Sequence, residues 1–278
     1  MIALIRTEFV KAARRTRTLI IAALLVGLPT LIVVAIKSRG DRPRNADRGE
    51  GLFRLASQSG LLVPAAVLSV TSGFLLIVIA GTFAGDSVAG DAGWGNLRYL
   101  LMRPVSRGRL LVAKATVAGL LIWVATILVA LSGLVAGVIL FGAHPVTVPA
   151  FAGGDAGGFT LNSGALIVRA LVAAGYVAFG FSALLAMGTL FSTLTDTATG
   201  AIGATIGVYI VSEILDGISA LGIIRYGFPT HYLDAWETMF TANSFSRDMV
   251  AGVAVQLAYL VVFGAAAVLW FQRKDIRS

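Results

Sequence analysis

The sequence predicts an all-α integral membrane protein whose single domain, residues 1–278, contains six transmembrane helices. Apolar residues make up 57% of the chain, charged residues only 13%, and the mean hydropathy is +0.88, which is not the composition of a soluble domain. A bilayer core of about 30 Å needs roughly 20 apolar helical residues, and the sequence contains several such runs. A membrane β-barrel would instead show strands of about 10 residues with alternating polarity, and this pattern is absent from the sequence.

Six apolar runs are long enough to cross the bilayer. They are residues 18–36, 61–85, 110–141, 164–191, 197–224 and 249–271. Several exceed the minimum length, so we expect tilted or kinked helices, or helical extensions into solvent. The first run is interpreted as an anchor and not as a removable signal peptide. Lys37, Ser38 and Arg39 follow it where a cleavage site of small residues would be required.

Residues 1–17 form a separate unit ahead of the first span. Ile2, Ile5 and Phe9 recur at helical spacing, while basic residues such as Lys11 and Arg15 occupy the remaining surface. This pattern predicts an amphipathic helix in the membrane interface, with its cations toward the anionic headgroups of the lipid bilayer. A plain basic flank is the alternative.

Basic residues also set the predicted orientation in the cell membrane, because cytoplasmic loops are enriched in Lys and Arg. They cluster in residues 1–17, 98–109 and 273–277, which share one side of a chain with six spans. Both termini are therefore expected in the cytoplasm. Residues 37–60 conflict with this rule, since they are basic and yet must lie outside. The net charge of +8 thus indicates topology, and nucleic-acid binding does not follow from it.

A polar segment, residues 86–109, separates the second and third spans and is longer than a reversal of the chain requires. Asp86 and Asp91 come first, and a glycine-rich turn after them would end any helix that leaves the second span. A helix of one or two turns is predicted over residues 97–102, ending before Pro104. Because so short a helix has little stability alone, we expect its leucines to insert into a groove on another protein.

This segment resembles the cytoplasmic loop in the permease subunits of type-2 ATP-binding-cassette (ABC) exporters. In that family an acidic stretch precedes Gly-Thr-Leu, a Leu-Leu pair, Pro-Val-Ser-Arg and a lysine that enters the next span. The matching residues are Asp86, Asp91, Gly95, Leu97, Leu100, Leu101, Pro104, Val105, Ser106, Arg107 and Lys114. The sequence departs from the pattern in having Asp where Glu is usual and Asn96 where Thr is frequent. The six spans and the amphipathic start extend the resemblance over nearly the whole chain.

The resemblance implies a permease subunit that forms the substrate path and carries out no covalent chemistry. ATP and Mg would bind to a separate ABC ATPase, two copies of which would move the bundle through a coupling helix. A second permease copy or a related permease would complete the route. The expected ATPase-coupling residues are Asp86, Asp91, Gly95, Leu97, Arg98, Leu100, Leu101, Pro104 and Arg107. No catalytic residue, cofactor or metal site is expected in the chain itself.

Glu213 and Asp216 lie within an apolar run, where acidic groups are costly and usually functional. Their i, i+3 spacing places them on one helical face. Three interpretations remain open. They bind a cationic substrate or a proton, they pair with Arg169 or Arg225, or they mark a break where the chain dips back near the outer face.

The first of these interpretations belongs to an alternative function, a stand-alone ion-coupled secondary transporter that uses the two carboxylates. The elaborate cytoplasmic segment argues against this alternative, as does the lack of an evident inverted repeat between the halves of the sequence.

Overall fold

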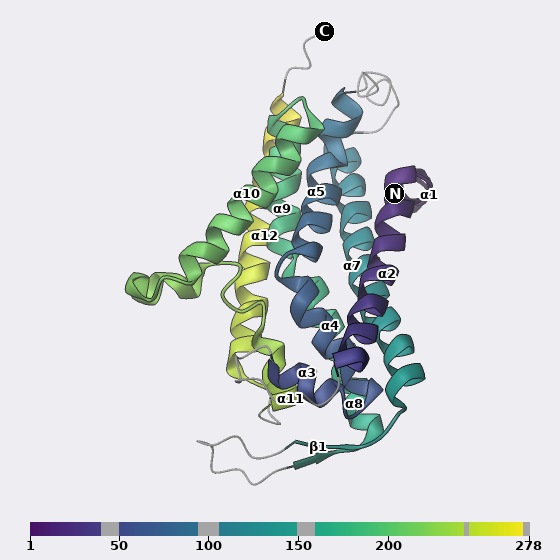
Figure 1. Ribbon diagram of the computed structural model, residues 1–278. Coiled ribbons are helices and arrows are strands. Elements are labelled where there is room, and N and C mark those ends of the chain that lie inside the picture. The colour runs from purple at the N-terminus through teal and green to yellow at the C-terminus, as the bar shows by residue number, and fades with distance from the viewer. Residues whose placement is uncertain (40–49, 94–105, 149–158, 242–244, 275–278) are drawn as a thin grey trace.

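The structure is a computed structural model that describes residues 1–39, 50–93, 106–148, 159–241 and 245–274. Its long helices run side by side as a bundle, with a short β-hairpin at the lower end in Figure 1. The elements are α1 (Ile2–Ala13), α2 (Thr16–Arg39), α3 (Glu50–Ala56), η1 (Gly60–Leu62), α4 (Val63–Ser72), α5 (Leu75–Gly93), α7 (Arg107–Phe141), β1 (Val146–Val148), β2 (Phe159–Leu161), α8 (Ser163–Gly180), α9 (Ser182–Leu194), α10 (Ala198–Asp216), η2 (Ser219–Gly227), η3 (Ala235–Glu237), α11 (Thr238–Thr241) and α12 (Arg247–Arg273).

The predicted fold class is confirmed. Among the described residues, six helical segments are long and apolar enough to cross a membrane. Helix α7 packs against α2, α4, α5 and α8, while α9 packs against α12 and α5. The buried core comes mainly from α4, α5, α7, α8 and α9, whereas α2, α10 and α12 present much apolar surface outward. Outward apolar surface is expected where lipid is the solvent.

At two positions the helices lie so close together that only glycine fits between them. A Cβ added at Gly85 would lie 2.8 Å from Ile202 Cα, where α5 meets α10. A Cβ added at Gly60 would lie 2.3 Å from the carbonyl carbon of Gly137, where η1 meets α7. Both neighbours are backbone atoms and cannot turn aside, so only glycine permits these approaches.

The helices that form the second and fourth predicted spans are each interrupted. In the second span α4 ends at Ser72 and α5 begins at Leu75, after which α5 continues to Gly93. The helix therefore runs through the start of the segment that we expected to be a polar loop from residue 86. In the fourth span Phe181 separates α8 from α9.

The fifth span differs most from the prediction. Helix α10 ends at Asp216, so the expectation that it extends to Ile224 is wrong. The 3-10 segment η2 follows as a separate element, and Gly222 within it has a φ of 53°, which a continuous helix does not permit. The apolar run continues past the helix end, which is why composition alone overestimated the length of the helix.

The two ends of the bundle carry different elements (Figure 1). Helix α1 and the C-terminal end of α12 lie toward the upper end, and α3, α11 and the hairpin lie at the lower end. The hairpin strands are antiparallel, with Val146 opposite Leu161. Helix α10 leans away from the bundle toward η2.

Candidate functional site

Helix α1 packs against α7 near the upper end of the bundle (Figure 1). Its residues Ile5, Phe9 and Ala12 lie on one face and pack against the hydrophobic core, as their helical spacing predicts. The predicted amphipathic helix is therefore present. Lys11 and Arg15 also hydrogen-bond to carboxylates on α5, which the sequence did not predict.

Asp86 on α5 accepts hydrogen bonds from two arginines. Arg15 Nη1 lies 2.7 Å and Arg17 Nη2 lies 2.6 Å from Asp86 Oδ2. Arg15 belongs to the turn between α1 and α2, and Arg17 belongs to the first turn of α2. The side chain of Asp86 is only 10% exposed, so these charge-assisted bonds fasten the α1–α2 turn to α5 in a largely dry setting.

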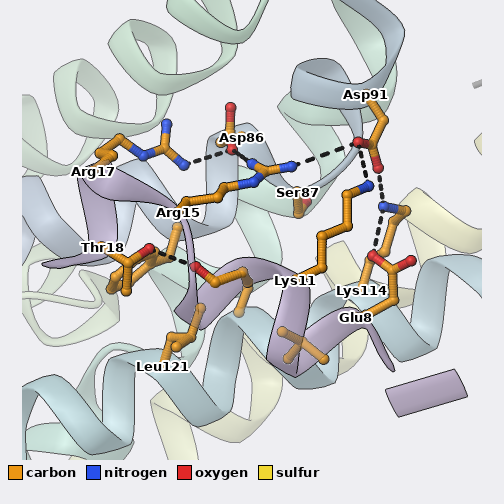
Figure 2. Close-up of a pocket in the computed structure, with 14 residues that line it drawn as sticks. Glu8, Lys11, Arg15, Arg17, Thr18, Asp86, Ser87, Asp91, Lys114 and Leu121 are labelled. Atoms are coloured by element: carbon orange, nitrogen blue, oxygen red, sulfur yellow. Dashed lines mark hydrogen bonds and ion pairs between the residues drawn. The ribbon is translucent and has the colours of Figure 1, made fainter. Parts of the chain in front are cut away.

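Asp91, further along α5, joins three elements. Its Oδ1 lies 3.0 Å from Lys11 Nζ and 3.6 Å from Arg15 Nη2, and its Oδ2 accepts a hydrogen bond from Lys114 on α7. Lys114 Nζ also donates to Glu8 Oε2 on α1 at 3.2 Å. Figure 2 shows Arg15 between Asp86 and Asp91, and Lys114 between Asp91 and Glu8. We call this set of ion pairs between α1, α2, α5 and α7 the junction.

Because two of its charged side chains are buried, the junction would lose stability if any one of its charged residues were replaced. The side chains of Asp91 and Lys114 are 4% and 5% exposed. Buried charges cost several kcal/mol of desolvation each unless opposite charges and hydrogen bonds compensate them, and each of these two has more than one such partner. If one charged side chain of the junction were removed, its buried partners would keep the desolvation cost with fewer opposite charges to offset it.

A serine on α9 holds the same stretch of α5. Ser192 Oγ accepts hydrogen bonds from the backbone N–H groups of Val88 at 2.9 Å and Ala89 at 2.8 Å. Ser192 is 1% exposed, so no solvent competes for these bonds. The part of α5 between Asp86 and Asp91 is thus fixed to α9 as well as to α1 and α7.

The junction lies directly before the predicted coupling helix in the chain. Helix α5 ends at Gly93, and α7 begins at Arg107 with Ser106 at its N-cap position. Six of the nine predicted coupling residues lie outside the described part of the chain: Gly95, Leu97, Arg98, Leu100, Leu101 and Pro104. The structure brings together Asp86 and Asp91 but places the third described residue, Arg107, elsewhere.

Arg107 belongs to a second set of contacts at the upper end. Its Nη1 donates to the backbone carbonyl of Lys274 at 2.7 Å. Lys274 Nζ in turn donates to the Thr193 carbonyl at 3.0 Å and to Asp196 Oδ1 at 2.7 Å. These contacts connect the start of α7 with the end of α12 and the turn between α9 and α10.

The other predicted polar site lies at the far end of α10. Asp216 Oδ1 is 2.6 Å from His231 Nδ1 and 3.6 Å from Arg225 Nε. The ion pair with Arg225 agrees with the second interpretation of this acidic pair, and the helix end at Asp216 agrees with the third. Arg169 donates a hydrogen bond to the Met239 carbonyl.

Sequence reasoning missed the partners of Asp86 and Asp91. One signal was available, because Glu8 is the only acidic residue among the first 40 and lies within a strongly basic segment. A lone carboxylate at helical spacing from Lys11 and Arg15 indicates a face with ion pairs. Nothing in the sequence pointed to Ser192 as an acceptor for backbone groups of α5.

The junction is suited to a mechanical role. Within the described ranges there is no group of three or more His, Asp or Glu side chains that could hold a metal ion. Its ion pairs and hydrogen bonds connect helices, so a displacement of α5 would be passed on to α1, α2 and α7.

Among the described residues, six apolar helices are long enough to span a bilayer, which indicates a multi-pass membrane protein. Buried ion pairs connect several of these helices at one end of the bundle. The chain belongs to the ABC-2 transporter family, since the model of the family described as ABC-2 family transporter protein matches residues 2–276. A search of curated proteins found no match. The predicted family is thus confirmed, and the chain is a permease of an ABC transporter.

Proposed function

We propose that this chain is the membrane subunit of an ABC exporter in the cell membrane, with both termini in the cytoplasm. Two ATPase subunits bind ATP and Mg and hydrolyse the nucleotide, and this chain with a second permease copy or a related permease forms the substrate path. Residues 97–102 act as the coupling helix that fits into a groove of the ATPase. Alternation between inward-open and outward-open states requires that nucleotide or substrate binds the two states differently.

The observation that carries the proposal is the position of the junction. Helix α5 leads into the coupling segment and carries Asp86 and Asp91, which bind cations of α1, α2 and α7. A movement of the coupling segment would therefore reach four helices through buried ion pairs. Family membership supports the partnership with an ATPase.

The test replaces Leu100 or Leu101 with Asp, which would place a carboxylate in the apolar contact with the ATPase. Desolvation of that carboxylate costs a few kcal/mol, so we expect weaker recovery of the ATPase in a pull-down and loss of transport. Because these residues belong to the loop after the second span, the amount of membrane-inserted permease should stay normal.

The matched control is Leu128→Asp, within α7, where the same substitution should damage folding or insertion instead. If Leu100→Asp and Leu101→Asp both keep full ATPase recovery and transport, residues 97–102 are not the coupling element.

The orientation is tested with single cysteines, because the chain contains none. Ser57, Asn162, Ser106 and Thr197 are all exposed and therefore accessible to a reagent. Cysteines at Ser57 and Asn162 should react with an impermeant maleimide in intact cells, and those at Ser106 and Thr197 should react only after lysis. The opposite pattern would invert the proposed topology.

A further inference from the structure

The break in the fourth span is completed by a side chain of another span. Phe181, with φ −89° and ψ 8°, separates α8 from α9. The first N–H groups of a helix have no partner within that helix and need one from elsewhere. The N–H group of Ala183, in the first turn of α9, donates at 2.9 Å to Oε1 of Gln256 on α12. Gln256 is only 4% exposed, so water does not compete for this bond.

The same glutamine holds a non-helical segment. Residues 228–233, which we call the return segment, form bends and turns between η2 and η3. Gln256 Nε2 donates to the Pro229 carbonyl of this segment at 2.7 Å. The two polar atoms of the amide therefore bind different elements, one on α9 and one on the return segment. A buried amide that is paired in this way fixes the position of one partner relative to the other.

Other side chains hold the return segment from α8 and α10. Tyr176 of α8 donates to the Tyr232 carbonyl at 2.7 Å, and Ser212 of α10 shares a hydrogen bond of 2.9 Å with Thr230. Neither of these bonds involves α9. In the described part of the chain, the hydrogen bonds that connect α9 with the return segment are those of Gln256.

At its other end α9 is fastened to α5 through Ser192. Helix α9 packs mainly against α5 and α12, whereas α8 packs mainly against α7. A displacement of α5 would therefore carry α9 with it, and the break at Phe181 is the point where the span can bend. We propose that Gln256 is a positioning residue for transport, which passes the movement of α9 to the return segment. This inference rests on the proposed function, because the movement of α5 begins at the coupling segment.

The first test needs only the purified full-length chain, in phosphatidylcholine nanodiscs. Gln256→Met keeps the length of the side chain but removes both hydrogen bonds, and hydrogen exchange followed by mass spectrometry reports on the backbone. Exchange should become roughly tenfold faster both in residues 182–192 and in the return segment, as expected for a lost buried hydrogen bond at each. Tyr259→Phe is the matched control on α12. It removes a hydroxyl that donates to the Gly227 carbonyl at 3.2 Å and should leave residues 182–192 unchanged.

The second test uses the complex with its ATPase subunits, with and without ATP and vanadate. In the wild type and in Tyr259→Phe, the nucleotide should change the exchange of α5, α9 and the return segment. In Gln256→Met the response of α5 should persist, while the response of the return segment should be lost. A merely structural role would change both nucleotide states alike. Gln256→Asn is the second variant, because its amide is one methylene shorter and cannot reach both partners.

Two results would overturn the inference. The first is unchanged exchange of residues 182–192 or of the return segment in isolated Gln256→Met. The second is a full nucleotide response of the return segment in both Gln256 variants. If the nucleotide leaves α5 of the wild type unchanged, the proposed function is contradicted instead, and the isolated chain still decides whether Gln256 connects the two segments.

Discussion

The carboxylates of the junction and Asp216 at the end of α10 differ in their burial and in how far along the chain their partners lie. Asp91 is 4% exposed and binds cations from α1 and α7, with Lys11 lying 80 residues away in the chain. Asp216 is 19% exposed, and its partner His231 lies only 15 residues away. The first set joins distant segments, whereas the second set closes a local turn.

The comparison shows that burial and the distance between partners in the chain, and not the presence of a carboxylate in an apolar run, separate a structural junction from a helix end. A buried carboxylate with cations from several helices is compensated only in the assembled bundle. A carboxylate at a helix end stays partly exposed to water, so it needs fewer partners from the protein. Substitutions in the two regions should therefore differ in size.

The largest effect is expected for Asp91→Asn. The substitution leaves Lys114 buried with Glu8 as its remaining acidic partner, and breaking a buried pair in this way typically costs about 3–5 kcal/mol. Unfolding in mixed micelles, followed by tryptophan fluorescence, measures the loss. Asp196→Asn is the control, because Asp196 is 82% exposed and its ion pair with Lys274 should contribute less than about 1 kcal/mol. Equal losses of stability in the two variants would show that the buried ion pair stabilises the protein no more than the exposed one.

A smaller effect is expected for Ser192→Ala, which removes the acceptor of the Val88 and Ala89 N–H groups. Leaving buried backbone donors without this acceptor should cost about 1–3 kcal/mol in the same unfolding measurement. Ser69→Ala serves as the reference, since Ser69 Oγ donates only to the Ala66 carbonyl of its own helix. If the two variants are equally stable, Ser192 does not hold α5 in place.

The effect of Asp216→Asn should be smaller still, about 1 kcal/mol, because the carboxylate is partly exposed and its partners are local. Transport that depends on the ATPase should persist in this variant and in Glu213→Gln. Loss of transport at normal protein levels in both variants would instead favour the secondary transporter in which these carboxylates couple ions.

A separate effect concerns pH. Burial, with a further contribution from Asp234, raises the pKa of Glu237 from 4.5 to about 7. The fold thus favours the protonated carboxyl, so its contribution to stability is complete below about pH 4.5 and is lost as the pH rises through about 7. The melting temperature of the wild type should fall between pH 5 and 8 more than that of Glu237→Gln, and identical pH profiles would contradict this assignment.

The sequence alone was sufficient for the fold class, the family and the amphipathic first helix. Each of these depends on residues that are close together in the chain. The length of an apolar run and the spacing of Ile5, Phe9 and Ala12 are local properties, and the loop motif around Pro104 is read in a single stretch. The motif also placed Asp86 and Asp91 among the residues of interest, though as contacts for an ATPase.

Only the tertiary structure decided which charges meet. Asp86 binds Arg15 across 71 residues, and Lys114 binds Glu8 across 106 residues, so these partners are set by the packing of α1, α5 and α7 and by no pattern in the sequence. The end of α10 at Asp216 is a similar case, since the apolar composition continues beyond it. Composition determines which segments prefer lipid to water, but the choice of partner for a buried charge depends on the helices that surround it.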